Sequence, residues 1–155
     1  MYKNCILKAV HGYDVRRTHI FQLVSITADM VAIIPDAIVI ATTHADEKDI
    51  KKITALCDEV EELINNHEDH TQKDIEFHTA IAMSSKNVVV PRLIPVINSS
   101  IPLFVETTGG TLHEETIETH REIADAIASH DTLRAQDAMY LHLVYNRKRI
   151  QMMKK

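Results

Sequence analysis

The sequence predicts an all-α fold: an antiparallel bundle of six or seven helices in one globular domain. Three observations predict it. The 155-residue chain has only three glycines and few alternating β-branched runs, its apolar residues recur at helical spacing, and capping residues and prolines divide it at intervals of a helix length. The composition is 45% hydrophobic and 25% charged, which excludes a disordered or fibrous chain.

The N-terminal segment predicts one helix within residues 15–26 and another within 30–43. The longest apolar stretch, residues 30–41, is about twelve residues long, short of the roughly twenty that cross a bilayer. The first twelve residues lack the pattern of a signal peptide. Cys5 and Cys57 form no CxxC pair, which is typical of a reducing compartment. We therefore expect no membrane segment and a cytoplasmic location.

Capping residues and prolines delimit the remaining helices. Asp46 is a good N-cap for a helix that ends at Asn65-Asn66, and a second helix spans about residues 70–85. Asn87 can cap the next segment, which contains three prolines. The first is tolerable in a first turn, and the later two should kink or divide the helix. Thr111 and Glu114 resemble a capping box that opens a helix through Ser129, and Asp131 caps the last helix. The three prolines are Pro91, Pro95 and Pro102.

The charge balance argues against a nucleic-acid surface on this domain itself. The formal net charge is −5 with histidine counted neutral, whereas such surfaces cluster lysine and arginine. Only residues 147–149 and the last two lysines are locally basic. We interpret them as a solvated helix end and a tail.

Ten histidines are many for this length, and three of them lie on helix faces that should point inward. Asp74 and His78 are four residues apart, so they share a helix face with Cβ atoms about 5–6 Å apart. His120 and His142 lie on apolar stripes of the last two helices. Three imidazoles and one carboxylate from three helices could thus meet in the interior, where a divalent cation would satisfy all of them.

Each of these residues also has a simpler explanation. A lone histidine on an apolar face is more often a hydrogen-bonded core residue than a ligand. Asp74 taken alone could be a first-turn acid that the helix dipole favours. From spacing alone, a metal site and an ordinary core remain equally good interpretations. The other seven histidines are predicted to face mostly solvent: His11, His19, His44, His67, His70, His113 and His130.

Three stretches between residues 30 and 150 carry a resemblance to a known family. They are Pro35-Asp36-Ala37 with the run at 45–50; Asp74-x-x-Phe77-His78-x-x-Ile81-Ala82 with Ser85-x-Asn87; and His120-Arg121-x-Ile123-x-x-Ala126-Ile127 followed by Asp131, Ala135, Ala138-Met139 and His142-Leu143. In this order and spacing the chain resembles the FCD domain, the effector-binding domain of the FadR subfamily of GntR transcription regulators.

The resemblance implies a metal site and a sensing function. The family's metal ligands fall on Asp74, His78, His120 and His142, with one or two coordination positions left open. An N₃O set favours zinc, and nickel, manganese, iron and cobalt also fit. The resemblance further implies a small carboxylic acid effector, control of DNA binding through an attached winged-helix domain, and a homodimer. Asn146, one turn beyond His142, is a candidate contact for the effector.

The chain departs from the family pattern in two places. Residues 1–29 are too few for a winged helix, so we assign them to an N-terminal segment and residues 30–155 to the effector- and metal-binding domain. Met30 and Ile34 stand where many members have an arginine and a glutamate, which puts an anion-contacting role at that position in doubt.

Two other functions fit the same four residues. One is a metal-dependent enzyme acting on a small molecule, which would also need a positioned acid or base. Glu76 is adjacent in sequence, but on a helix it points away from Asp74 and His78. The other is a structural metal that fastens three helices and binds no effector.

Overall fold

The computed structural model describes residues 15–109 and 111–153, and side chains from Ser25 onward. Over these ranges it contains six α-helices, one 3-10 helix and no strand, which confirms the predicted all-α bundle. The elements are α2 (Val15–His44), α3 (Glu47–Asn65), α4 (Thr71–Ser84), η1 (Val90–Leu93), α5 (Ile94–Thr108), α6 (His113–Ala128) and α7 (Thr132–Met152).

The two helices predicted before residue 44 are one continuous helix, α2. Thr27, Ala28 and Asp29 were expected to separate them, but none of these residues prevents helix formation, and Thr27 is fully buried. Pro35 also lies inside the helix and is buried. Packing along α7 holds these residues in a single element.

The predicted caps of α3 and α7 are confirmed. The Asp46 carboxylate accepts a hydrogen bond from the Asp49 amide at 2.9 Å, and the Asp49 carboxylate in turn accepts one from the Asp46 amide at 3.1 Å. Asp131 accepts from the Arg134 amide at 3.1 Å. Each cap satisfies a backbone N–H that the first turn of a helix leaves without an internal partner.

Of the two prolines expected to kink or divide the helix, Pro95 lies at the start of a new helix, α5, whereas Pro102 does not divide it. Asn87 accepts from the amides of Val89 and Val90 just before η1, but the N-cap of η1 is Val89. Pro102 stays inside α5.

The capping box predicted at Thr111 and Glu114 is wrong. The N-cap of α6 is Leu112, which makes no side-chain cap bond. The Thr111 hydroxyl donates instead to the Thr108 carbonyl at 2.7 Å and so completes the end of α5.

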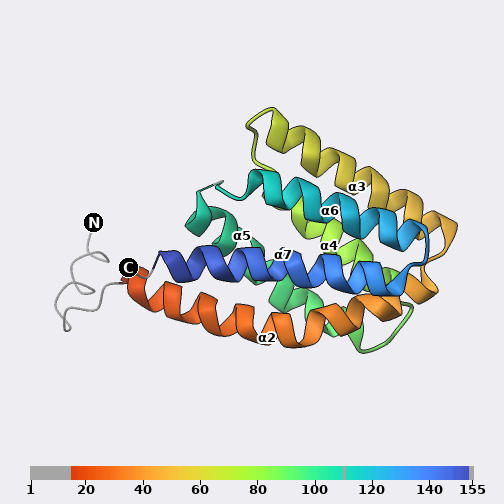
Figure 1. The fold of residues 1–155 in the computed structure, drawn as a ribbon, viewed down its shortest axis with the longest axis horizontal. Coiled ribbons are helices and arrows are strands. Elements are labelled where there is room, and N and C mark those ends of the chain that lie inside the picture. Colours follow the sequence, from red (N-terminus) through yellow and green to blue (C-terminus); the bar gives the residue numbers. More distant parts are fainter. Residues whose placement is uncertain (1–14, 110, 154–155) are drawn as a thin grey trace, which may run out of the picture.

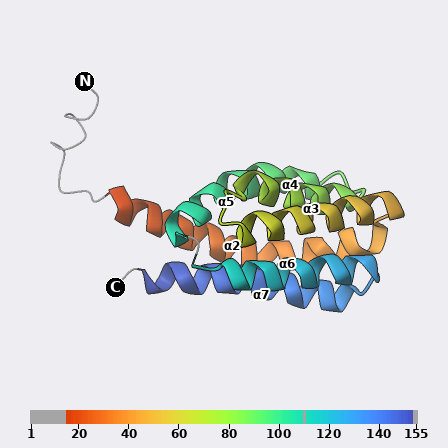
Figure 2. The same cartoon turned by 90° about the horizontal axis from the view of Figure 1, so that it is seen from above.

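The long helices lie roughly side by side, and neighbours in sequence run antiparallel (Figure 1). α2 packs along α7, which also packs on α6, while α3 and α4 complete the bundle on the other side of α6 (Figure 2). The core between them is apolar and continuous, with Phe77, Ile123, Ile127 and Ala135 fully enclosed. Burial of this surface supplies the main favourable term in folding.

Within the described residues, one segment is long and apolar enough to cross a membrane by length and composition. It covers Ser25–His44 of α2, with a mean hydropathy of 1.6, and is longer than the stretch noted from the sequence. A core helix of a soluble protein passes the same test, and α2 packs against α4, α5, α6 and α7.

Candidate metal centre

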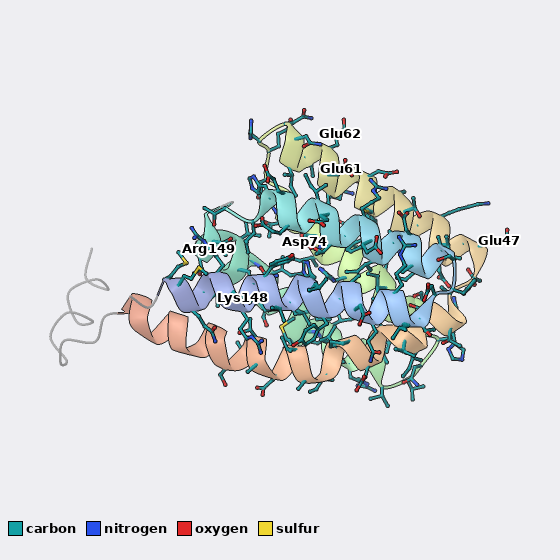
Figure 3. All side chains as sticks on the ribbon, in the orientation of Figure 1. Glu47, Glu61, Glu62, Asp74, Lys148 and Arg149 are labelled. Carbon is teal, nitrogen blue, oxygen red and sulfur yellow. The ribbon has the colours of Figure 1, made fainter. Side chains whose placement is uncertain are left out.

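Four side chains from three helices meet in the interior of the bundle. Asp74 and His78 lie one turn apart on α4, His120 comes from α6, and His142 comes from α7. All four are buried, His120 almost completely at 1% exposure. Figure 3 shows Asp74 in the middle of the molecule, between the long helices. The helical spacing that predicted four inward-facing residues therefore holds.

The distances are those of groups arranged around one point. One nitrogen from each of His78, His120 and His142 lies within 4.8 Å of the others. The Asp74 Oδ1 atom lies 3.2 Å from His78 Nε2 and 3.6 Å from His120 Nε2. Two ligands held about 2.1 Å from a zinc ion at a tetrahedral angle would be about 3.4 Å apart.

Some of these buried atoms have no hydrogen-bond partner. Among the described residues, Asp74 Oδ1 and both ring nitrogens of His120 are enclosed without one, although Asp74 Oδ1 is near two imidazoles. Buried polar atoms are nearly always paired, because leaving them unpaired costs free energy. The arrangement suits a cation better than it suits a network of hydrogen bonds.

The Thr119 hydroxyl orients His142. Thr119 donates its only proton to the Glu115 carbonyl at 2.6 Å, and its oxygen lies 3.0 Å from His142 Nδ1. The oxygen must therefore accept from Nδ1–H, which leaves Nε2 unprotonated. A second partner that fixes the tautomer in this way is typical of metal-binding histidines.

Burial keeps the inner imidazoles neutral. It lowers the pKa of His120 well below its usual value and the pKa of His142 to about 3, so both offer a lone pair at pH 7. Burial alone would raise the pKa of the Asp74 carboxyl. The His78 ring against it and the electrostatic effect of the surrounding imidazoles, His120 foremost, outweigh burial and lower that pKa below its usual range. Asp74 is therefore a carboxylate.

The ring of Phe77 forms a wall behind the site. It is fully buried and stacks on His120, with centroids 4.5 Å apart and planes at 28°. It also meets the His78 ring edge-on at 5.3 Å. This contact restricts both imidazoles to one orientation.

A cavity, here called the site cavity, opens onto Asp74, His78 and His142. It encloses about 670 Å³ of empty space, part of it continuous with solvent, between α2, α4, α5, α6 and α7. Asn146 lies in its wall, where its Nδ2 donates to the His142 carbonyl at 3.2 Å and lies 3.5 Å from His142 Nε2. His120 is behind the cavity rather than in its lining.

Two of the histidines expected to face solvent line this cavity instead. His70 is buried and His113 half-buried, and their rings meet edge-on with centroids 5.6 Å apart. The ends of α4 and α6 turn these rings inward, so helix-end position was a poor guide to exposure. His44, His67 and His130 are exposed as predicted, while His11 and the His19 side chain fall outside the described residues.

Sequence reasoning also missed Thr119 and Phe77. Thr119 looked like an ordinary helical residue beside His120, and its contact with His142 exists only because α6 packs on α7. Phe77 was noted only as a helical apolar residue and part of the family motif. Its position directly before His78 was the available signal that it would support the site.

The side chain of Glu76 faces away from the site, as expected. It accepts hydrogen bonds from Gln72 at 3.2 Å and Lys73 at 3.1 Å. It is therefore not positioned as a catalytic acid or base for the four-residue cluster.

Comparisons with known proteins agree with this fold. The FCD domain model matches residues 29–145. A relative in Bacillus subtilis (strain 168), an uncharacterized HTH-type transcriptional regulator called YcbG, is 30% identical over 120 residues, covering 73% of this chain and 48% of the relative. The chain thus spans about half the length of that relative.

A solved structure, Streptococcus agalactiae GntR, has the same fold with a TM-score of 0.73 and 23% identity, covering 88% of this chain and 61% of the other. These matches are to transcription regulators and give no support to the metal-dependent enzyme that the sequence left open. The chain therefore belongs to the FCD domain family.

Proposed function

We propose that this domain senses a small carboxylic acid through a divalent metal ion held by Asp74, His78, His120 and His142. The observation that carries the proposal is the buried convergence of these side chains, with unpartnered polar atoms, at the floor of a cavity. Three nitrogens and one oxygen suit zinc, with nickel, manganese, iron and cobalt as alternatives. The bound ion would supply a positive charge with open coordination positions for the acid's oxygen atoms.

The chain's own residues hold and orient the acid. His78, His142 and Asn146 face the cavity, so a carboxylate near the cluster lies within reach of the Asn146 amide. The cavity is walled by five helices, and occupancy that favours one arrangement of them by about 1–3 kcal/mol would be enough to act as a switch. In the whole regulator, a winged-helix domain would convert this change into altered DNA binding.

We also propose the setting in which the switch works. Residues 30–155 form the sensing unit, residues 1–29 lead into it, and the domain acts as a cytoplasmic homodimer. Size-exclusion chromatography with light scattering tests the dimer, since a monomeric mass at micromolar concentration would contradict it.

The central experiment measures metal and acid binding together. Metal content after dialysis against zinc should be about one ion per chain. His142→Ala should lose the ion, while His44→Ala, an exposed histidine on α2, should keep it. Equal metal content in the two variants would contradict the site.

The acid is then tested on the zinc-loaded protein by thermal shift. Acetate, lactate and citrate should include at least one acid that raises the melting temperature of the wild type and His44→Ala but not of His142→Ala. A saturated zinc ion with no response to any acid would indicate a structural metal. Hydrolysis of esters or phosphates by the loaded protein would favour an enzyme.

A further inference from the structure

A second cavity lies behind His78, on the side of the site cavity nearest α2, α4 and η1. Its lining surrounds about 340 Å³ of space not filled by protein atoms, part of it open to solvent, and it is here called the apolar cavity. Its lining consists of alanine, isoleucine, valine, leucine and methionine side chains, with the imidazole of His78 as the one polar group. Ala37 of α2, Ile81 of α4 and Leu93 of η1 are typical of this wall.

The two cavities are neighbours with a shared wall. Ile34, His78, Ile97 and Met139 line both of them. A molecule anchored beside His78 in the site cavity therefore needs to pass only these side chains to enter the apolar cavity. Methionine is flexible and unbranched, so Met139 can adjust to such a molecule.

The described linings of both cavities lack lysine and arginine. The polar groups of the site cavity beyond the cluster are neutral or titratable: His70, Thr108, His113, Thr116 and Asn146. A second carboxylate or a phosphate would be buried without a matching cation, at a large cost. Several hydroxyls, as in a sugar acid, would find no partners in the apolar cavity.

Arg149 is the nearest cation beyond His142 on the same face of α7, seven residues along the chain, or about 10 Å along the helix. Figure 3 shows it toward the C-terminal end of α7, away from Asp74. Its Nε atom is buried without a hydrogen-bond partner, but Arg149 is not part of the lining of either cavity. Its guanidinium could hold a second anionic end of the effector, so replacing Arg149 tests the opposite conclusion.

We infer that the effector is a monocarboxylic acid with an aliphatic chain, whose tail lies in the apolar cavity. The inference rests on the proposed function, because the carboxylate end is assigned to the cluster of Asp74, His78, His120 and His142. It adds the chemical class of the rest of the molecule: unbranched or lightly branched hydrocarbon, without further charge. Hydrophobic burial of the tail then supplies most of the selectivity among acids.

The test is a series of straight-chain acids, acetate, butanoate, hexanoate and octanoate, titrated calorimetrically into the zinc-loaded chain. Each methylene that enters the apolar cavity should tighten binding about fourfold. Hexanedioate and gluconate, matched to hexanoate in carbon number, should bind roughly tenfold more weakly or not at all.

A variant that fills the apolar cavity locates the tail. Ala37→Leu, at a partly buried position in its wall, should weaken octanoate by roughly tenfold and leave acetate unchanged. Ala32→Leu, at an exposed position on the same helix, should change neither. Unchanged acetate binding also shows that Ala37→Leu is folded and loaded with metal.

Three results would overturn the inference. Affinity that does not depend on chain length, or octanoate binding that Ala37→Leu leaves intact, would remove the tail from the apolar cavity. Tighter binding of hexanedioate that Arg149→Gln abolishes would assign a doubly charged effector instead. In each of these cases an acid still binds and the proposed function stands, whereas failure of every acid, lactate and citrate included, would reject both.

Discussion

The hydroxyl of Thr119 decides which nitrogen of His142 faces the cluster, because its own proton is given to the Glu115 carbonyl. Thr119→Val should therefore weaken zinc binding about 10–100-fold, the usual cost of losing such an outer partner. Competition with a chromophoric chelator measures this affinity.

Two variants control for side effects of the threonine substitution. Thr119→Ser keeps the hydroxyl and should bind zinc as the wild type does. Thr43→Val removes an exposed helical hydroxyl on α2 and should have no effect on zinc. A Thr119→Val protein with unchanged zinc affinity would show that His142 needs no orienting partner.

Cys57 provides a second prediction at the scale of one residue. Burial raises the pKa of its thiol to about 11, and the thiolate is the reactive form, so the native thiol should not react at pH 8. In a Cys5→Ser background, a thiol reagent should label Cys57 only after denaturant unfolds the chain. Rapid labelling of the native protein would contradict this.

The four residues of the cluster could be predicted because helical spacing alone sets which side chains share a face. Asp74 and His78 are one turn apart, and His120 and His142 lie on apolar stripes, so their inward direction follows from periodicity. The contacts of Thr119 with His142 and of His70 with His113 could not, because each joins two helices whose relative position depends on the whole packing.

At the scale of the element, helix starts are set by short-range bonds that mutation can remove. The Asp131 carboxylate caps α7, so Asp131→Ala should destabilise the protein by about 1 kcal/mol. For a domain of this size that corresponds to a fall in melting temperature of about 2–4 °C.

The matched variants lie on the same helix or at the same position. Asp131→Asn keeps an oxygen that can accept from the Arg134 amide and should lose much less stability. Asp137→Ala removes an exposed acid from the middle of α7 and should be nearly neutral. Equal melting temperatures for Asp131→Ala and Asp137→Ala would exclude the cap as a source of stability.

Element boundaries were predictable where a local bond defines them. Asp46 and Asp131 each cap the helix expected from their residue type. Thr111 has an equally suitable hydroxyl, but this hydroxyl donates to the end of the preceding helix. Residue type alone does not distinguish these two roles. The unbroken course of α2 past Thr27 likewise depends on its packing along α7 rather than on local preference.

At the scale of the whole molecule, the proposed ion would tie together α4, α6 and α7. A ligand at a hundred times its dissociation constant stabilises a fold by about 2.7 kcal/mol, so zinc should raise the melting temperature by about 5–10 °C. A chelator should reverse this gain in the wild type.

His120→Ala should have a melting temperature that neither zinc nor chelator changes, because it lacks one ligand. His130→Ala, an exposed histidine after α6, should respond to both as the wild type does. Calorimetry of the four combinations separates the contribution of metal from that of packing, and a zinc response in His120→Ala would remove that residue from the site.

The fold class of the whole molecule could be predicted from the sequence, but the cavities between its helices could not. Helical periodicity and the family motif both indicated the bundle, and the solved relative has the same fold. The two cavities were beyond sequence reasoning, since residues as distant along the chain as Met30 and Asn146 line one space. Met30 and Ile34 were noted in the sequence only because they depart from the family pattern. In the structure both side chains line the site cavity.

Because α2 is one unbroken helix, a small rotation of the helix near these two residues would move its distant N-terminal end. Ile34 touches both cavities, and the helix begins at Val15, about 28 Å away at the rise of an α-helix. A rod of that length pivoting by about 5° near Ile34 moves its far tip by about 2.5 Å. A bound molecule that rotated α2 by this angle at Ile34 would therefore shift the start of the helix by about the length of a short side chain.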